Sequence, residues 1–196
     1  MKVYLVYCHP SETSITAAAR DRALAGLQAA GHDVRVNDLY AEGFVPELSA
    51  WERTNHLAPP DTKPEIAPYA ANLRWCEALV MVYPTWWAGQ PAMLKGWIDR
   101  VWVSGVAYEL PEGANRIRPK LQNIRRIVAI TTHGSSKFVN ILEGEGGKRI
   151  VTRSLRVLCS KLARTKWIAL YRIDRSTDAQ RTQYLDRVEQ AMRELH

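Results

Sequence analysis

Three short segments of this chain hold the residue types that could bind a ligand or do chemistry. The first, CHPSETSIT at 8–16, gathers an imidazole and several hydroxyls where a helix is expected to begin. A helix N-terminus presents unpaired N–H groups, so this segment suits a phosphate group. Ordinary capping of the helix by Ser11 or Thr13 explains the same residues, and from this segment alone capping is the favoured interpretation.

The second segment, YPTWWAGQPAM at 83–93, places Trp86 and Trp87 next to each other between Pro84 and Gly89. Indole rings at the edge of a sheet can flank a flat aromatic ligand, and N–H groups around Gly89 could reach its polar edge. The alternative is that both indoles are buried against the segment 39–68. The pattern favours contact with a ligand.

The third segment, TTHGSSK at 131–137, combines small hydroxylated residues with Gly134, which permits a ligand to approach the backbone closely. His133 could donate a proton near pH 7. A single histidine in a loop is more often merely exposed, and that alternative stays open here.

These segments must be positioned by strands and helices that alternate along the chain. Period-two and apolar runs predict strands, and a period near 3.6 predicts helices, one of them starting at Pro91. The strands are expected at 2–8, 33–38, 78–83, 126–132 and 166–171, and the other helices at 13–30, 49–56, 69–76, 148–162 and 177–194. The alternation predicts an α/β fold, a doubly wound five-stranded parallel sheet with helices on both faces. In the common order 2-1-3-4-5, ligands bind beyond the carboxyl ends of the strands, where the three segments lie.

Length predicts one domain over 1–196, with irregular excursions at about 39–68 and 103–123. No apolar run reaches the length of a membrane span, and residues 1–10 do not read as a signal peptide. Three widely spaced cysteines indicate neither a disulfide framework nor a metal site. A reducing cytoplasm is the expected setting.

A net charge of +7 permits a nucleic-acid partner. The densest basic stretch, 116–126, carries no aromatic residue, so no nucleic acid is expected. The GxGxxG, complete phosphate-loop and GxSxG motifs are missing from the sequence, which disfavours the corresponding nucleotide-binding and hydrolase classes.

With these residues in place, the chain resembles the NAD(P)H:quinone oxidoreductases of the DT-diaphorase type. VYPTWWAGQPAMLKGWIDRVW at 82–102 is similar to their flavin loop and the helix that follows. Weaker similarities follow in the same order as in that family, namely 9–16, 38–49, 106–111 and 130–136. The resemblance covers nearly the whole chain.

This resemblance implies a flavodoxin-like domain that binds a flavin and forms a homodimer. FAD is the expected cofactor, and FMN, used by related branches, is the alternative. The family's motifs place the phosphate end at His9, Thr13, Ser14, Ile15 and Thr16. They place the isoalloxazine beside Pro84, Thr85, Trp86, Trp87, Ala88 and Gly89, and its polar edge at Thr131, Thr132, His133 and Gly134. Tyr108 is expected to line the pocket where nicotinamide and acceptor alternate.

The implied activity is ping-pong hydride transfer from NAD(P)H through the flavin to a quinone or a similar small acceptor. His133 and Tyr108 are the expected catalytic residues, and no metal is expected. Two alternatives remain. One is a flavodoxin-type electron carrier without turnover of its own, and the other is an ancillary subunit of a potassium-efflux system.

The sequence departs from this family at two places. Its quinone reductases carry a tyrosine and a histidine after the fourth strand, where an ungapped reading finds Val139 and Glu145. Neither residue can replace them, which casts doubt on a quinone as the physiological acceptor. The second departure is His133, where the family usually has a small residue.

Overall fold

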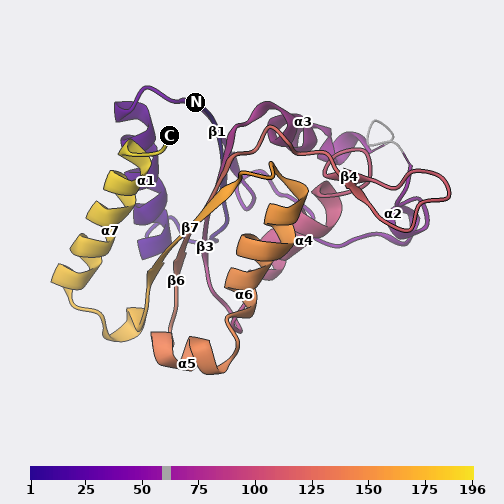
Figure 1. Cartoon of the computed structure of the whole chain (residues 1–196). Helices are drawn as coiled ribbons and strands as arrows, with labels where there is room; N and C mark the ends of the chain where they lie inside the picture. The colour runs from indigo at the N-terminus through magenta and orange to yellow at the C-terminus, as the bar shows by residue number, and fades with distance from the viewer. Residues whose placement is uncertain (59–62) are drawn as a thin grey trace.

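Five parallel strands form the centre of the protein (Figure 1). The computed structural model describes residues 1–58 and 63–196; Pro59 and Pro60 of the expected excursion lie outside the described residues. The strands are β1 (Lys2–Tyr7), β2 (Asp33–Asp38), β3 (Ala78–Pro84), β6 (Arg126–Thr132) and β7 (Arg164–Leu170). Their order, β2-β1-β3-β6-β7, confirms the order 2-1-3-4-5 expected from the sequence.

The burial of each strand follows its place in the sheet. Every residue of β3 is buried, as expected for a central parallel strand that is covered on both faces. β1 is buried from Val3 to Tyr7. The edge strand β2 is largely exposed or half-buried, and it shows alternation instead of a continuous apolar run.

Helices cover both faces of the sheet. α1 (Ile15–Ala29) and α7 (Asp178–Arg193) lie together on one face, shown at the left of Figure 1, and share one apolar core. α3 (Ala67–Trp75) and α4 (Ala92–Val101) contribute to the core on the other face. None of the helices in the described ranges is long and apolar enough to cross a membrane.

The helix expected at 148–162 is wrong in its bounds and its winding. The structure has α6 (Gly146–Arg149), then a wider π-type segment η3 (Ile150–Leu155), then a tight turn η4 (Arg156–Leu158). We call this run the composite helix. Leu162, the last residue of the expected helix, lies beyond the end of the composite helix and is 83% exposed.

The two excursions contain short elements. The first holds α2 (Ala50–Thr54) and η2 (Pro64–Ile66), and the second holds the two-residue strands β4 (Tyr108–Glu109) and β5 (Arg118–Pro119). A buried ion pair fastens the first excursion to α4, because Arg100 Nε donates to Glu52 Oε1 over 2.8 Å. The first excursion also touches α4 at Gly96. A Cβ at Gly96 would lie 2.2 Å from the carbonyl oxygen of Pro46, so glycine is needed for this contact.

Candidate functional site

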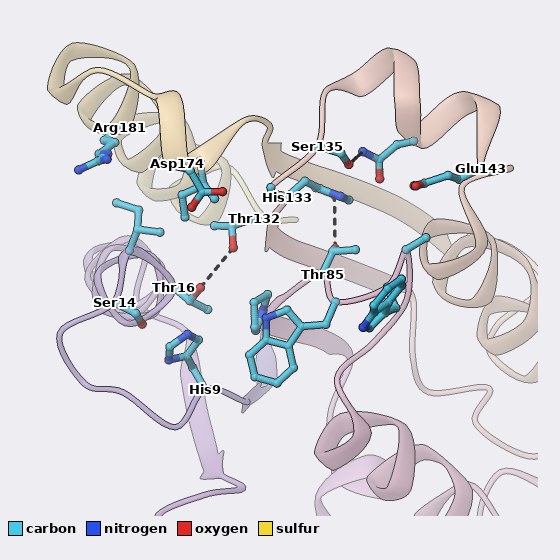
Figure 2. Close-up of a pocket in the computed structure, with 18 residues that line it drawn as sticks. His9, Ser14, Thr16, Thr85, Thr132, His133, Ser135, Glu143, Asp174 and Arg181 are labelled. Carbon is cyan, nitrogen blue, oxygen red and sulfur yellow. Dashed lines mark hydrogen bonds between the residues drawn. The ribbon is translucent and has the colours of Figure 1, made fainter.

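A cleft of about 840 Å³ opens at the carboxyl ends of the central strands, as the sheet order requires (Figure 2). The three segments singled out in the sequence meet there. The predicted residues that line it are His9, Ser14, Ile15, Thr16, Pro84, Thr85, Trp86, Trp87, Ala88, Thr132, His133 and Gly134.

Four predicted site residues lie outside this lining. Thr13 is exposed in the first loop, where its hydroxyl bonds Ser11. Gly89 closes a turn, and Thr131 is fully buried behind the cleft. Tyr108 lies on β4, packs against the core cluster on the α4 side of the sheet and is outside this lining, so its place at a substrate pocket stays a prediction.

The first loop leaves the start of α1 open toward the cleft. Ser14 is the N-cap, and its Oγ accepts from the N–H of Ala17 at 3.1 Å and donates to the carbonyl of Ser11 at 2.9 Å. The expected cap at Ser11 or Thr13 is therefore wrong. The N–H groups of Ile15 and Thr16 stand in the first turn, where no intrahelical acceptor exists, so they can bind an anion.

The second loop turns back on itself within four residues. Trp86 and Gly89 exchange both backbone hydrogen bonds, at 3.1 and 3.0 Å, and Trp87 and Ala88 take positive φ values of 49° and 57°. Two positive φ values define a type I′ turn, a strained choice for residues other than glycine or asparagine. Trp87 is fully exposed and Trp86 nearly half exposed, so burial of both indoles against the excursion at 39–68 is excluded.

Hydrogen bonds from the start of the composite helix hold this turn in place. The N–H of Gly147 donates to the carbonyl of Ala88 at 2.9 Å, and Gln90 Nε2 donates to the carbonyl of Gly147 at 2.8 Å. A Cβ on Gly147 would lie only 3.1 Å from both the Ala88 oxygen and the Gly89 Cα. A glycine at 147 therefore lets the two segments touch.

Hydroxyl groups join the second and third loops. The Oγ1 atoms of Thr85 and Thr131 lie 2.8 Å apart, and the N–H of Thr85 donates to the carbonyl of Thr132 at 2.8 Å. Thr132 also approaches Thr16 on α1, with 3.5 Å between their hydroxyl oxygens, as drawn in Figure 2. The cleft is thus framed by three connected loops.

His133 is buried, not exposed as the alternative interpretation held. Its ring stacks on Tyr171 with the centroids 4.6 Å apart, and its Nε2 lies 3.4 Å from Thr85 Oγ1. Burial lowers the pKa of His133 to about 4, so the ring is neutral at pH 7. The catalytic role expected for His133 stays a prediction, with the ring acting as a neutral group at pH 7.

The polar atom left over on this ring is Nδ1, which is buried and has no hydrogen-bond partner within residues 1–58 and 63–196. A buried polar atom without a partner is costly, so it marks a place where a ligand or a water would be stabilised. A neutral imidazole that accepts from Thr85 at Nε2 carries its proton at Nδ1 and can donate there.

Sequence reasoning missed six lining residues; Ser135 lies within the third segment itself, and the other five follow it on later elements. They are Ser135, Asn140, Glu143, Ile173, Asp174 and Arg181. Asn140 belongs to α5 (Lys137–Leu142), a helix the sequence did not predict, and Ile173 and Asp174 to the short turn η5 (Ile173–Arg175). Arg181 lies in the first turn of α7 and reaches the cleft through the fold. A single sequence gives no sign that a basic residue at such a position is part of a site.

The two residues that depart from the family pattern lie apart from the cleft lining. Val139 is on α5 and is 37% exposed. The carboxylate of Glu145 pairs with Lys148 Nζ at 2.8 Å and borders a small cavity behind His133. Neither side chain occupies the place of a proton donor at the cleft.

Other chemistry at the site is limited. Burial raises the pKa of the Cys8 thiol, at the end of β1, to about 12, so this thiol is not a nucleophile at pH 7. Within the described ranges, His, Cys, Asp and Glu form no group of three or more that could hold a metal ion.

Comparison with known proteins places these features in context. A family model described as a flavodoxin-like fold matches residues 1–195. The chain is 32% identical over 168 residues to the uncharacterized NAD(P)H oxidoreductase YcaK of Escherichia coli (strain K12), covering 82% of this chain and 78% of that protein. It is 28% identical to NAD(P)H dehydrogenase (quinone) 1 of Cavia porcellus over 76% of this chain, and it spans 60% of that protein's length.

Two solved structures share the whole architecture. Smu.1420 from Streptococcus mutans UA159 has a TM-score of 0.85 with 29% identity, and the match covers 100% of both chains. The NAD(P)H:quinone oxidoreductase from Methanothermobacter marburgensis has a TM-score of 0.85 with 26% identity, over 100% of this chain and 99% of that one.

Proposed function

This chain belongs to the flavodoxin-like family, and from that premise we propose that it is a flavin-dependent NAD(P)H oxidoreductase that reduces a quinone or a similar small acceptor. The resemblance to NAD(P)H:quinone oxidoreductases expected from the sequence is confirmed by its relatives. Because the chain spans only about 60% of the length of the Cavia porcellus relative, the activity itself is our inference.

The observation that carries the proposal is the union of three features in one cleft. Open N–H groups at the start of α1 can hold a phosphate, the exposed indoles of Trp86 and Trp87 can wall a flat ring system, and the neutral imidazole of His133 lines the same cleft. These residues fit a flavin, whose phosphate tail, planar rings and polar edge each need one of these groups. When bound, a flavin supplies hydride acceptance from NAD(P)H and onward transfer to the acceptor.

The chain's own residues then bind, orient and shield. The first turn of α1 and Ser14 hold the anionic tail, and Pro84, Thr85 and Ala88 set the plane of the rings. His133, whose ring stacks on Tyr171 and is neutral at pH 7, would orient the polar edge by hydrogen bonding. We assign it a hydrogen-bonding role instead of delivery of a proton from an imidazolium.

We further propose that the two substrates use the same open side of the cleft in turn, in a ping-pong sequence, and that the working form is a homodimer. FAD is favoured over FMN because the first loop, led by His9, resembles the FAD type. The ping-pong sequence, the homodimer and the preference for FAD all rest on the resemblance to the quinone oxidoreductases. Mass identification of the bound flavin distinguishes FAD from FMN.

The test is an absorption spectrum of the purified protein, followed by mass identification of the compound that heat releases. We expect the absorption bands of a flavin and the mass of FAD. Double-reciprocal plots of initial rate against NAD(P)H concentration, at several fixed concentrations of a simple quinone, should give parallel lines. Protein that is colourless and stays so with added FAD or FMN would end the proposal. A flavin-bound protein that does not consume NAD(P)H with a quinone would indicate the electron-carrier alternative.

A matched pair of variants ties the flavin to the cleft. Trp86→Ala with Trp87→Ala removes two exposed rings, so we expect weaker flavin binding with little change in unfolding temperature. Trp51→Ala removes an exposed indole from α2, away from the cleft, and is expected to leave flavin binding unchanged.

A further inference from the structure

Charge is distributed very unevenly along this chain. Residues 113–173 contain fourteen lysines and arginines against only Glu143 and Glu145, a net charge of +12, whereas the remainder carries −5. No acidic residue occurs from 146 to 173. Such asymmetry creates a strong local field and is typical of a surface that meets a polyanion or an anionic membrane.

The fold displays part of this charge on the outer side of the composite helix and the turn that follows it. We call Arg149, Arg153, Arg156 and Lys161 the basic flank. Arg149, Arg153 and Lys161 are exposed. Among the residues that the structure describes, none of the four has a carboxylate within 4.0 Å. Like charges one helical turn apart repel each other, so this arrangement costs stability unless an outside anion compensates it.

Two apolar side chains project from the same flank. Val157 is 61% exposed and Leu162 is 83% exposed. Leu162 is held out by an ordered turn, because Arg156 Nε donates to the carbonyl of Ala163 at 2.8 Å and its Nη2 donates to the carbonyl of Lys161 at 3.2 Å. A fixed, protruding leucine within unpaired basic residues is the pattern of a surface that sits in a lipid headgroup region.

We propose that the basic flank docks this protein on a bilayer containing anionic phospholipids, with Val157 and Leu162 entering the headgroup region. This interaction does not depend on the proposed function. Gly147, in the first turn of the composite helix, contacts the turn at the cleft, whereas Val157 lies in its last turn and Leu162 lies beyond it, just before β7. The cleft itself is at the carboxyl ends of the strands, so a docked molecule keeps it open to solution.

Two other occupants fit the flank less well. A second copy related by two-fold symmetry would bring the same patch against itself, and the like charges would repel. Single-stranded nucleic acid is bound by stacking of bases on aromatic side chains. The exposed tryptophans and phenylalanine within the described ranges, Trp51, Trp86, Trp87 and Phe138, all lie outside the composite helix and its turn.

The test is co-sedimentation of the full chain with vesicles of phosphatidylcholine alone and with phosphatidylglycerol added. We expect binding only to the anionic vesicles, and loss of that binding as salt screens the charges. Each basic residue near such a surface strengthens binding about fivefold, so Arg153→Glu with Lys161→Glu should weaken binding more than tenfold. The matched control, Arg53→Glu with Arg175→Glu, makes the same charge change at exposed residues elsewhere and should bind nearly as the wild type does.

A second variant keeps the charge and separates lipid from nucleic acid. Val157→Ser with Leu162→Ser should weaken vesicle binding several-fold and leave binding to a single-stranded oligonucleotide unchanged; an unaltered unfolding temperature verifies the fold. Equal sedimentation with both kinds of vesicle overturns the proposal. So does equal loss in the charge control, or vesicle binding that the two serines do not change.

Discussion

The imidazole of His133 is held neutral at the point where the cleft presents polar atoms. Its pKa is lowered to about 4 by burial, whereas in the unfolded chain it takes its ordinary value near 6.5. Between these values the unfolded chain binds more protons than the folded protein does. The free energy of unfolding contributed by this residue is therefore fully present above pH 6.5 and decreases as the pH falls toward 4.

We predict that His133→Gln removes this pH dependence. Between pH 6.5 and 4.5, the wild type should lose stability relative to the variant with a slope of up to about 1.4 kcal/mol per pH unit. Urea unfolding at a series of pH values measures this slope. His56→Gln, which removes an exposed imidazole, is the control. Identical slopes for the wild type and His133→Gln would show that the buried ring is not the source.

At the scale of elements, the aromatic wall of the cleft depends on a contact between segments far apart in the sequence. The turn at 86–89 holds two residues at positive φ, and its carbonyl at Ala88 is anchored by the N–H of Gly147. A Cβ at Gly147 would lie 3.1 Å from that carbonyl oxygen, so the turn would have to shift by a few tenths of an ångström. Adjacent Gly146 provides a comparison, because a Cβ at that position would lie 3.8 Å from the same carbonyl, an ordinary contact.

We predict that Gly147→Ala displaces the turn and Gly146→Ala does not. Overpacking at Gly147 should cost about 1–3 kcal/mol and weaken flavin binding, since Trp86 and Trp87 move with the turn. Thermal unfolding together with flavin titration measures both effects. If the two alanine variants behave alike in both measurements, the close approach at Gly147 does not position the wall.

The elements also show why the sequence predicted the sheet better than the site. The strands at 33–38 and 126–132 were predicted with the observed bounds, because alternating valines and a continuous apolar run are typical of strands. α5 was missed because it spans only six residues, too few for a periodic signal, although Phe138, Ile141 and Leu142 recur at helical spacing on it. The change of winding within 146–158 likewise leaves no periodic signal, and Arg181 reaches the cleft only through the packing of α7 on α1.

At the scale of the whole molecule, Tyr108 and the cleft of its own chain lie apart. β4 belongs to the second excursion, on the side of the sheet covered by α3 and α4 (Figure 1), whereas the cleft opens beyond β1, β3 and β6. The resemblance implies that a tyrosine at this position covers a substrate pocket. In the homodimer that we propose, Tyr108 can be remote from the cleft of its own chain and still cover a substrate pocket if it covers the cleft of the partner chain.

This arrangement predicts complementation between two inactive variants. Ala88→Arg fills the cleft of one chain, and Tyr108→Ala removes the tyrosine from the other. A mixed dimer then contains one intact cleft covered by an intact Tyr108, so co-expression should restore up to half of the activity per dimer with a quinone. If Tyr108 acts within its own chain, the mixed dimer has no complete site and stays inactive. A cleft shared between two chains can work only after the chains assemble. Analytical ultracentrifugation of each variant alone therefore checks that both still form dimers.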